Sequence, residues 1–470
     1  MSALWTSAEA TAATQGTSNR EWSASGVSID SRSLARGDLF VAIKGLKSDG
    51  HDHVADALGK GAAAAAVSRS LKQIPKDAPL LLVADTQKAL EDLGRSSRSR
   101  GNAIVIGVTG SVGKTGTKEA LRHALERQGP TLASLGSLNN QWGVPLSLAR
   151  MPRETKYGVF ELGMNHPGEI DALTRLVRPD VALITTVEPA HLGFFSSVEA
   201  IADAKAEIFN GMNGRGSAVL NRDNPYYERL AAAAASAGIG RIISFGAHEE
   251  ASVRLVDCDL HGCASAVTVS VMGNVFDYSV ALPGRHWVMN SLAVIASVKA
   301  AGGDEIAAAA AMATLEPMAG RGARFKIKVP GGEALLIDES YNASPASMRA
   351  AFAVLAAMKP KNGGRRVAVL GDMLELGKDS EKLHAGLAPA LAEANVDLVF
   401  TAGPQMRALF DALPAHLRGF HAASAADLAD KLSTQLRPGD VVTVKGSHGS
   451  RMYELAARLS SGANPVPVKG

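Results

Sequence analysis

Short apolar runs that end in glycine or a small polar residue, each followed by a helical pattern, recur along this chain of 470 residues. They are typical of parallel βα units, in which buried strands alternate with covering helices. We therefore predict an α/β fold built on parallel sheets. Such sheets bind ligands at the carboxyl ends of their strands, so the residues directly after each run are the first candidates for a site. The predicted strands are 103–108, 159–163, 181–187, 367–371, 398–403 and 441–446.

The chain is too long for one hydrophobic core. Single cores stop growing at roughly 250 residues, and 46% of the residues here are hydrophobic. An Arg/Ser-rich stretch at 94–102 is typical of a linker, and an Ala-rich helical pattern gives way to a strand-like run at 318–324. We therefore predict three domains, at 1–100, 101–319 and 320–470.

Charge and hydropathy exclude several classes of partner. The 49 Lys and Arg residues nearly balance the 46 Asp and Glu residues, and no run of like charges indicates a nucleic-acid surface. The apolar stretches at 61–67 and 306–315 are far shorter than the roughly 20 residues that cross a bilayer, so we expect no membrane insertion. Residues 1–20 lack the basic and apolar regions of a secretory signal. We expect a cytoplasmic protein with Cys258 and Cys263 as free thiols.

A glycine-rich turn follows the first long predicted strand. Residues 104–117 read IVIGVTGSVGKTGT, with a helical segment predicted at 118–128. Glycines let backbone N–H groups turn toward phosphate oxygens, the helix N-terminus adds positive potential, Lys114 supplies a cation and the Thr115 hydroxyl can bind magnesium. The alternative is a glycine-rich βα turn with a solvated lysine. We predict a nucleoside triphosphate site at Thr109, Gly110, Ser111, Val112, Gly113, Lys114 and Thr115.

Three further candidates follow predicted strands or lie on the next helix: Glu161, His191 and Lys205. A carboxylate at the end of the strand beside the phosphate loop can hold Mg²⁺ against the nucleotide, because hard cations prefer oxygen ligands. Imidazole is not a typical magnesium ligand, so His191 by itself is more typical of a structural residue. Lys205 by itself is typical of a solvated helix lysine.

The segment TGSVGKT is similar to the TG(T/S)xGKT phosphate loop of the Mur ligases and the related folylpolyglutamate synthases, and the resemblance extends over nearly the whole chain. It implies that Glu161 and His191 contact metal ions. It also implies that Lys205, in the context AKAEI, is carbamylated by carbon dioxide near a second magnesium ion. Catalytic roles for Lys114, His191 and Lys205 follow from the same resemblance.

The segment GRHWVMNSLAV at 284–294 resembles the family's GxHxxxNxLA segment, which implies that the Asn290 amide contacts adenine. An asparagine can donate and accept at once, as the adenine edge requires. The residues alone leave a second interpretation open, in which Asn290 caps the following helix.

In the third predicted domain, residues 335–352 read LLIDESYNASPASMRAAF, in which Ser344 and Pro345 are typical of a helix N-cap and first helical position. This segment and GDMLELG at 371–377 resemble the dipeptide-adding Mur ligases. The resemblance implies that Asp338 approaches the nucleotide ribose and Arg321 the phosphates. It also implies substrate contacts at Ser31, Arg32, Asn139, Asn140, Asn342, Ser344, Lys445 and Ser447. His448 stands where the family commonly has arginine, so we expect no guanidinium contact there.

The prediction is an α/β protein in which a central P-loop parallel-sheet ATPase domain is flanked by an N-terminal UDP-substrate domain and a C-terminal Rossmann-like domain. The resemblance implies ATP-dependent joining of D-alanyl-D-alanine to a UDP-N-acetylmuramoyl tripeptide through an acyl phosphate, in peptidoglycan synthesis, with two Mg²⁺ ions. Another Mur-type amino-acid-adding ligase or a folylpolyglutamate synthase is the nearest alternative, and a P-loop ATPase that forms no bond is the distant one. We expect a monomer. The third residue of the tripeptide, diaminopimelate or lysine, stays open.

Overall fold

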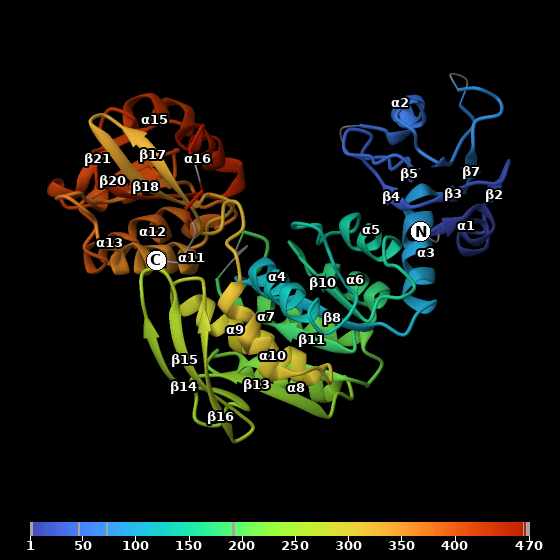
Figure 1. Ribbon diagram of the computed structural model, residues 1–470, viewed down its shortest axis with the longest axis horizontal. Helices are drawn as coiled ribbons and strands as arrows, with labels where there is room; N and C mark the ends of the chain where they lie inside the picture. The colour runs from blue at the N-terminus through green and yellow to red at the C-terminus, as the bar shows by residue number, and fades with distance from the viewer. Residues whose placement is uncertain (1–2, 46–47, 72–73, 190–192, 464, 467–470) are drawn as a thin grey trace.

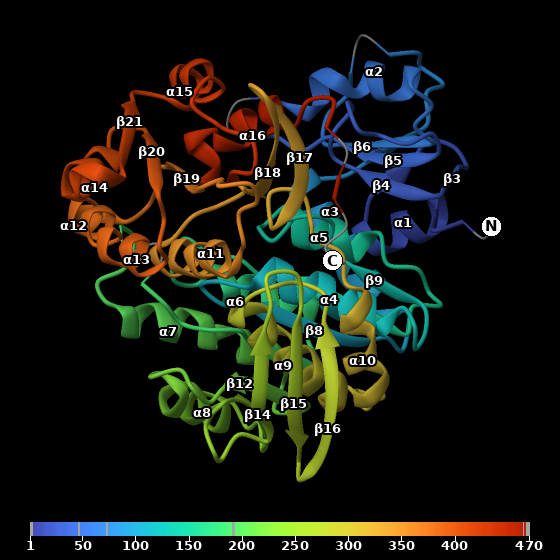
Figure 2. The same ribbon diagram turned by 60° about the vertical axis from the view of Figure 1, so that its left-hand side comes forward.

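Three β-sheets, each in its own lobe, organise the chain. The computed structural model describes residues 3–45, 48–71, 74–189, 193–463 and 465–466. The N-terminal lobe, blue in Figure 1, and the C-terminal lobe, orange to red, lie on the same side of the central lobe, and Figure 2 shows this arrangement after rotation. Within the described residues the three large sheets have five, nine and six strands in chain order, and a separate two-stranded antiparallel sheet lies in the N-terminal lobe. The predicted three-domain α/β fold is confirmed.

The N-terminal sheet is small and mostly parallel. Its elements are β1 (Trp5–Thr6), α1 (Ser7–Thr14), β2 (Thr17–Ser18), β3 (Ser23–Ala24), β4 (Gly26–Ser28), β5 (Asp38–Val41), η1 (Gly50–His53), α2 (Val54–Gly59), β6 (Ala64–Val67) and β7 (Leu80–Leu82). The strand order is β2-β7-β6-β5-β4, with β2 and β7 antiparallel and the other neighbours parallel. β6 has the sequence AAAV and is buried along its whole length, because helices cover both of its faces.

Helix α3 (Thr86–Ser99) joins the N-terminal and central lobes (Figure 1). It includes residues 94–99, so the prediction of a linker at 94–102 is wrong for that part. The Arg98 guanidinium donates to the Val177 carbonyl of the central lobe at 3.0 Å. Arg100 lies 4.2 Å from the ring centroid of Trp5. The arginines of this stretch therefore pack between the two lobes.

The central sheet places the carboxyl ends of three parallel strands together. Its elements are β8 (Ile104–Thr109), α4 (Lys114–Leu125), β9 (Thr131–Ala133), α5 (Gly143–Ala149), β10 (Tyr157–Glu161), α6 (Glu169–Val177), β11 (Val181–Ile184), α7 (Val198–Ala206), η2 (Glu207–Gly211), β12 (Ser217–Asn221), α8 (Tyr227–Ser236), β13 (Arg241–Gly246), β14 (Val253–Leu260), β15 (Ser265–Val271), β16 (Asn274–Val280), α9 (Arg285–Ala300), α10 (Glu305–Ala311) and η3 (Met312–Thr314). The order is β16-β15-β14-β13-β12-β11-β8-β10-β9, parallel from β9 to β14 and antiparallel from β14 to β16. One core packs α4, α9 and α10 on the sheet, and a second packs α5 to α8 on the other face. Because β8 lies between β10 and β11, the residues after these strands meet at one edge.

The C-terminal lobe is a mainly parallel sheet with an antiparallel edge. Its elements are β17 (Ala323–Val329), β18 (Gly332–Glu339), α11 (Pro345–Ala357), β19 (Arg366–Gly371), η4 (Gly377–Asp379), α12 (Ser380–Ala385), α13 (Ala388–Glu393), β20 (Leu398–Ala402), α14 (Met406–Ala412), η5 (Ala415–Leu417), β21 (Arg418–Ala422), α15 (Ala425–Leu432), β22 (Val441–Lys445), η6 (His448–Ser450) and α16 (Met452–Ser460). The order is β17-β18-β22-β19-β20-β21, and only the β17–β18 pair among these is antiparallel. Ser344 caps α11 and Pro345 begins it, as predicted.

The loop between β14 and β15 reaches from the central lobe to the C-terminal lobe, beneath α11 (Figures 1 and 2). Arg324 on β17 is 4% exposed and donates to the Gly262 carbonyl at 2.6 Å. Its second terminal nitrogen lies 3.5 Å from the Cys263 Sγ. Cys258 and Cys263 are free, as predicted. We call this loop, residues 261–264, the hairpin tip.

The helices of the three lobes are short. The longest among the described residues is α9, with 16 residues. None of the helices that the structure describes combines the length and apolar character needed to cross a bilayer.

Candidate active site

A cleft of about 670 Å³ lies between the central and C-terminal lobes. Its central wall consists of the β8–α4 loop, residues after β10 and β11, and the first turns of α9. Its C-terminal wall includes residues at or after the carboxyl ends of β18, β19 and β22, the first turns of α11 and the turn before β17. Most of these segments follow the carboxyl ends of parallel strands, where open α/β sheets bind ligands.

The β8–α4 loop has the geometry of a phosphate-binding loop. Gly110 and Gly113 have φ of +145° and +88°, which glycine adopts without strain. Gly113 is the N-cap of the 12-residue helix α4 and offers no side chain to its first N–H groups, so these donors can bind an anion. The Lys114 ammonium donates to the Gly110 carbonyl at 2.6 Å. Burial lowers the pKa of Lys114, while Glu161 opposes that shift.

The loop residues divide into two groups. Ser111, Val112, Gly113, Lys114 and Thr115 line the cleft. Thr109, at the end of β8, is fully buried behind the loop. Five of the predicted loop residues therefore face the cleft, whereas Thr109 lies behind them, and nucleotide binding by the loop stays a prediction.

Two residues after β11 fasten the loop in place. Thr185 is 5% exposed, and its hydroxyl donates to the Val112 carbonyl at 2.6 Å. The Ser111 hydroxyl donates to the Glu188 carbonyl and accepts from the Glu188 N–H, both at 3.0 Å. The sequence analysis missed Thr185, which lies within the predicted strand 181–187, and Glu188, which directly follows that strand.

Glu161 ends β10 beside the phosphate loop and is 1% exposed. Its Oε1 accepts from the Asn139 amide at 2.8 Å, while its Oε2 has no hydrogen-bond partner in the described part of the chain. An unsatisfied buried acceptor costs about 1–3 kcal/mol, so this oxygen is suited to a cationic ligand. A carboxylate oxygen next to a phosphate site fits Mg²⁺. His191 lies outside the described residues.

Lys205 on α7 is 2% exposed, so its interpretation as a solvated lysine is wrong. Within the described residues, its ammonium makes no hydrogen bond or ion pair. Burial lowers the pKa of Lys205 well below its usual value, and the positive charge of Lys114 lowers it further. Such an environment favours the neutral amine, which is the form that reacts with carbon dioxide.

Asn290 lies in the second turn of α9 and faces the phosphate loop. A Cβ added to Gly113 would lie 3.0 Å from the Asn290 Oδ1. The N-cap of α9 is Gly284, so the interpretation of Asn290 as a helix cap is wrong. The preceding His286 and Trp287 also line the cleft, and the sequence analysis did not single them out. Burial lowers the pKa of His286 to about 4, and Lys445 adds to the shift.

Arg321 connects the C-terminal lobe to the phosphate loop. Its guanidinium donates to the Thr115 hydroxyl at 3.2 Å and lies 4.3 Å from the ring centroid of Tyr341. Asp338 does not line the cleft. It accepts from the Gly320 N–H at 3.1 Å and so holds the turn that carries Arg321.

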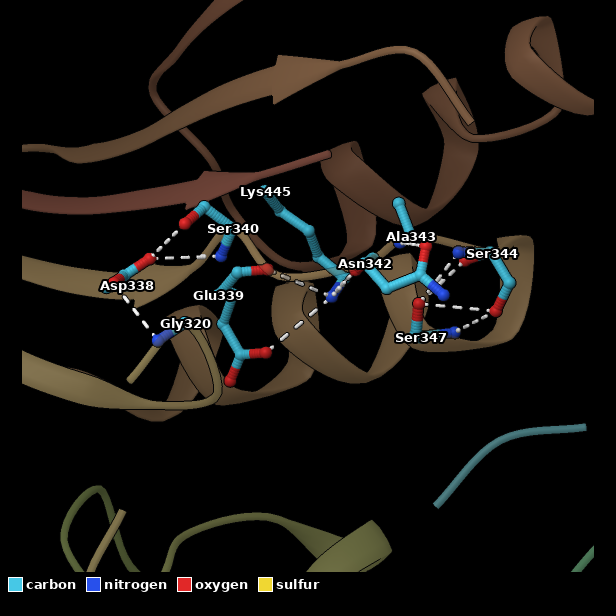
Figure 3. A network of polar contacts seen from close by, with 9 residues as sticks. All are labelled: Gly320, Asp338, Glu339, Ser340, Asn342, Ala343, Ser344, Ser347 and Lys445. Carbon is cyan, nitrogen blue, oxygen red and sulfur yellow. Dashed lines mark hydrogen bonds and ion pairs between the residues drawn. The ribbon is translucent and has the colours of Figure 1, made fainter. Parts of the chain in front are cut away.

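A charge pair between the largely buried Glu339 and the buried Lys445 forms part of the C-terminal wall (Figure 3). Glu339 and Lys445 are paired residues of β18 and β22, and their carboxylate and ammonium lie 3.6 Å apart. Lys445 also donates to the Asn342 carbonyl at 2.9 Å. Burial raises the pKa of Glu339 and lowers that of Lys445, and each residue opposes the other's shift. Asn342 lines the cleft with them, and the sequence analysis missed Glu339.

The serines of this wall shape its loops. Ser344 lines the cleft, but its hydroxyl accepts from the Ser347 N–H and so caps α11. Ser447 accepts from the Leu374 N–H at 2.9 Å and donates to the Ala343 carbonyl at 3.3 Å.

Three predicted substrate residues are not brought into the cleft: Ser31, Arg32 and Asn140. Arg32 is exposed and pairs with Asp30 at 2.7 Å in the N-terminal lobe. The Asn140 amide oxygen accepts from the N–H groups of Trp142 and Gly143 at the start of α5. A role for these three residues in binding substrate therefore stays a prediction.

Family models match three successive parts of the chain. Residues 23–97 match the Mur ligase family catalytic domain, residues 108–298 the Mur ligase middle domain, and residues 323–448 the Mur ligase glutamate ligase domain.

Individual proteins match over almost the whole length. The UDP-N-acetylmuramoyl-tripeptide--D-alanyl-D-alanine ligases of Escherichia coli (strain K12) and Rickettsia prowazekii (strain Madrid E) are 37% and 33% identical, over 92% and 91% of this chain and 93% and 94% of their own. The crystal structure of MurF from Acinetobacter baumannii superposes with a TM-score of 0.84 at 32% identity, covering 97% of this chain and 98% of that one. The MurF ligase from Thermotoga maritima in complex with ADP superposes with a TM-score of 0.74 at 26% identity, covering 92% and 96%.

Proposed function

Because the chain belongs to the Mur ligase family, we propose that it joins D-alanyl-D-alanine to a UDP-N-acetylmuramoyl tripeptide at the expense of ATP, in peptidoglycan synthesis. The observation that carries this proposal is the full-length similarity to ligases of that name. The cleft supports it, because a phosphate loop on one lobe faces a polar wall on another.

The first step makes the tripeptide carboxylate reactive. Its oxygen attacks the γ-phosphorus of ATP, the bond from that phosphorus to the β–γ bridging oxygen breaks, and an acyl phosphate and ADP result. Positioning and charge neutralisation dominate such transfers. The N–H groups at the start of α4, the Lys114 ammonium and the Arg321 guanidinium are the donors nearest the phosphates. Asn290, beside Gly113, is placed to contact adenine.

The second step forms the amide. The neutral dipeptide amine attacks the acyl carbon, the carbon–oxygen bond to phosphate breaks, and the departing phosphate takes up the proton that the nitrogen loses. The C-terminal wall, with Asn342 and Lys445, presents the dipeptide to the phosphate loop. Closure of the two lobes would keep water from the acyl phosphate.

Mg²⁺ is the metal that the donors fit best. Thr115 and Glu161 would hold it, with His191 and a carbamylated Lys205 at a second ion. Bound there, the metal neutralises charge on the phosphate oxygens. The unpaired Oε2 of Glu161 and the buried amine of Lys205 support this assignment.

The three domains divide the substrates between them. We assign residues 1–100, with Ser31 and Arg32, to the UDP-sugar, residues 101–319 to ATP, and residues 320–470 to the dipeptide. Asn139 acts through Glu161, to which it donates. Because the reaction uses ATP and a nucleotide-linked precursor, we expect it to take place in the cytoplasm, carried out by a monomer.

The test is ADP release by the purified protein with ATP, Mg²⁺ and the UDP-linked tripeptide, with and without D-alanyl-D-alanine. We expect release to depend on both the tripeptide and the dipeptide, and Lys114→Ala to abolish it while the melting curve stays unchanged. Release that needs no amine would favour an ATPase that forms no bond. Release with D-glutamate or L-lysine as acceptor, in place of the dipeptide, would favour another ligase of the family.

A further inference from the structure

Glu188 and Arg349 carry opposite charges on opposite sides of the cleft. Glu188 lines the central wall. Arg349 is an exposed residue of α11, beside Ala346 and Ala350, which line the C-terminal wall. Burial raises the pKa of Glu188, and the positive charge of Arg349 opposes that rise. The two side chains are therefore near enough for their charges to interact.

The two side chains do not touch. No nitrogen of Arg349 lies within 4.0 Å of a Glu188 carboxylate oxygen. In the part of the chain that the structure describes, neither side chain makes a hydrogen bond or ion pair with any other residue. A partly buried carboxylate without a cation is unfavourable. The gap between the two charges is therefore suited to a ligand with a positive and a negative end.

The position of Glu188 fixes which end of a ligand goes where. Its backbone makes two hydrogen bonds with the hydroxyl of Ser111 in the phosphate loop, so its carboxylate stays beside that loop. An acyl phosphate must form at the same place, because the γ-phosphate is held there. Arg349 lies on the opposite lobe, away from the reacting bond.

We propose that Glu188 binds the ammonium group of the incoming dipeptide and Arg349 binds its terminal carboxylate. This inference rests on the proposed function and names the residues that recognise its second substrate. Arginine binds carboxylates through two parallel hydrogen bonds. With one charge beside the phosphate loop and the opposite charge on α11, the cleft favours a zwitterion, and its amine arrives next to the activated carbonyl carbon.

A comparison of two acceptors tests the role of Arg349. D-Alanyl-D-alaninamide keeps the amine of the dipeptide and lacks the carboxylate charge. A charge-assisted hydrogen bond contributes about 1.5–3 kcal/mol, so the wild type should show a KM about 10- to 100-fold higher for the amide than for the dipeptide. Arg349→Met should raise the KM for the dipeptide by the same factor, leave kcat nearly unchanged, and leave the KM for the amide unchanged.

Glu188→Gln tests the other end. It should raise the KM for both acceptors by about 10- to 100-fold, with the KM for ATP and the Mg²⁺ requirement unchanged. Arg407→Met is the matched control, because Arg407 is an exposed arginine of the same lobe whose partner is Asp411 on its own helix. It should leave the kinetics for both acceptors as in the wild type.

Two outcomes would overturn this inference and leave the proposed function unaffected. Arg349→Met that still prefers the dipeptide to its amide would show that the carboxylate is bound elsewhere. Glu188→Gln that changes the Mg²⁺ requirement and leaves the KM for the dipeptide unchanged would place Glu188 at the metal. If the wild type showed no dipeptide-dependent turnover, the proposed function itself would be wrong, and this inference with it.

Discussion

Replacing Thr185 by valine would remove one hydroxyl from beneath the phosphate loop and change little else in size. The Val112 carbonyl would lose the donor that now lies at 2.6 Å. Thr185 also packs so closely against Gly110 that a Cβ added to Gly110 would collide with the Thr185 hydroxyl. A methyl group in place of that hydroxyl would therefore crowd Gly110. A lost hydrogen bond that leaves an acceptor unsatisfied costs about 1–3 kcal/mol. A domain of 150–250 residues loses about 2–4 °C in Tm for each kcal/mol. We therefore expect the central domain to melt about 2–12 °C lower.

The same change should weaken ATP binding, because the ligand must then order a loop that is no longer held. If about 1.4 kcal/mol of this cost appears in binding, the KM for ATP rises about tenfold. Thr185→Ser is the matched control, since it keeps the hydroxyl and loses only a methyl group, worth about 0.8 kcal/mol. Melting curves without nucleotide and ATP-dependent initial rates give the two readouts. A valine variant that matches the wild type in both, or a serine variant that binds ATP as poorly as the valine variant, would refute the role given to this hydroxyl.

Two further changes probe the buried ionisable groups of the cleft. Lys205→Ala should abolish turnover, and formate or acetate should restore part of it by replacing the lost carbamate; failure of every small carboxylate to restore activity would count against carbamylation. His286 should make the protein less stable as the pH falls from about 6.5 to about 4, because the unfolded chain takes up a proton there that the folded chain does not. In His286→Gln, unfolding measured across that range should show a weaker dependence on pH, and an unchanged dependence would contradict the depressed pKa.

Local signals predicted the strands and the phosphate loop because a few neighbouring residues determine them. The apolar run before Gly110 is a buried strand, and the glycines of the loop adopt the positive φ values that binding an anion requires. Ser344 and Pro345 likewise begin α11 through contacts within one turn. In each case the residues that set the conformation are adjacent in sequence.

Contacts between distant residues could not be predicted in this way. The hydrogen bond from the Thr185 hydroxyl to the Val112 carbonyl joins residues that are 73 positions apart. The stretch at 94–102 is polar in sequence, yet Arg98 extends across the boundary to a carbonyl 79 residues away. Lys205 has the sequence context of a surface helix, and only the packing of α7 against the rest of the central lobe buries it.

The hairpin tip gives the C-terminal lobe a second attachment to the central lobe, besides the covalent connection that carries Arg321. A body fixed at two points can turn easily only about the line that joins them. Arg324 fixes one point through the Gly262 carbonyl, and the turn next to Thr115 fixes the other. While both contacts hold, we expect any rotation of the C-terminal lobe to take place about the line through them, so that the far end of the cleft would move further than the phosphate loop.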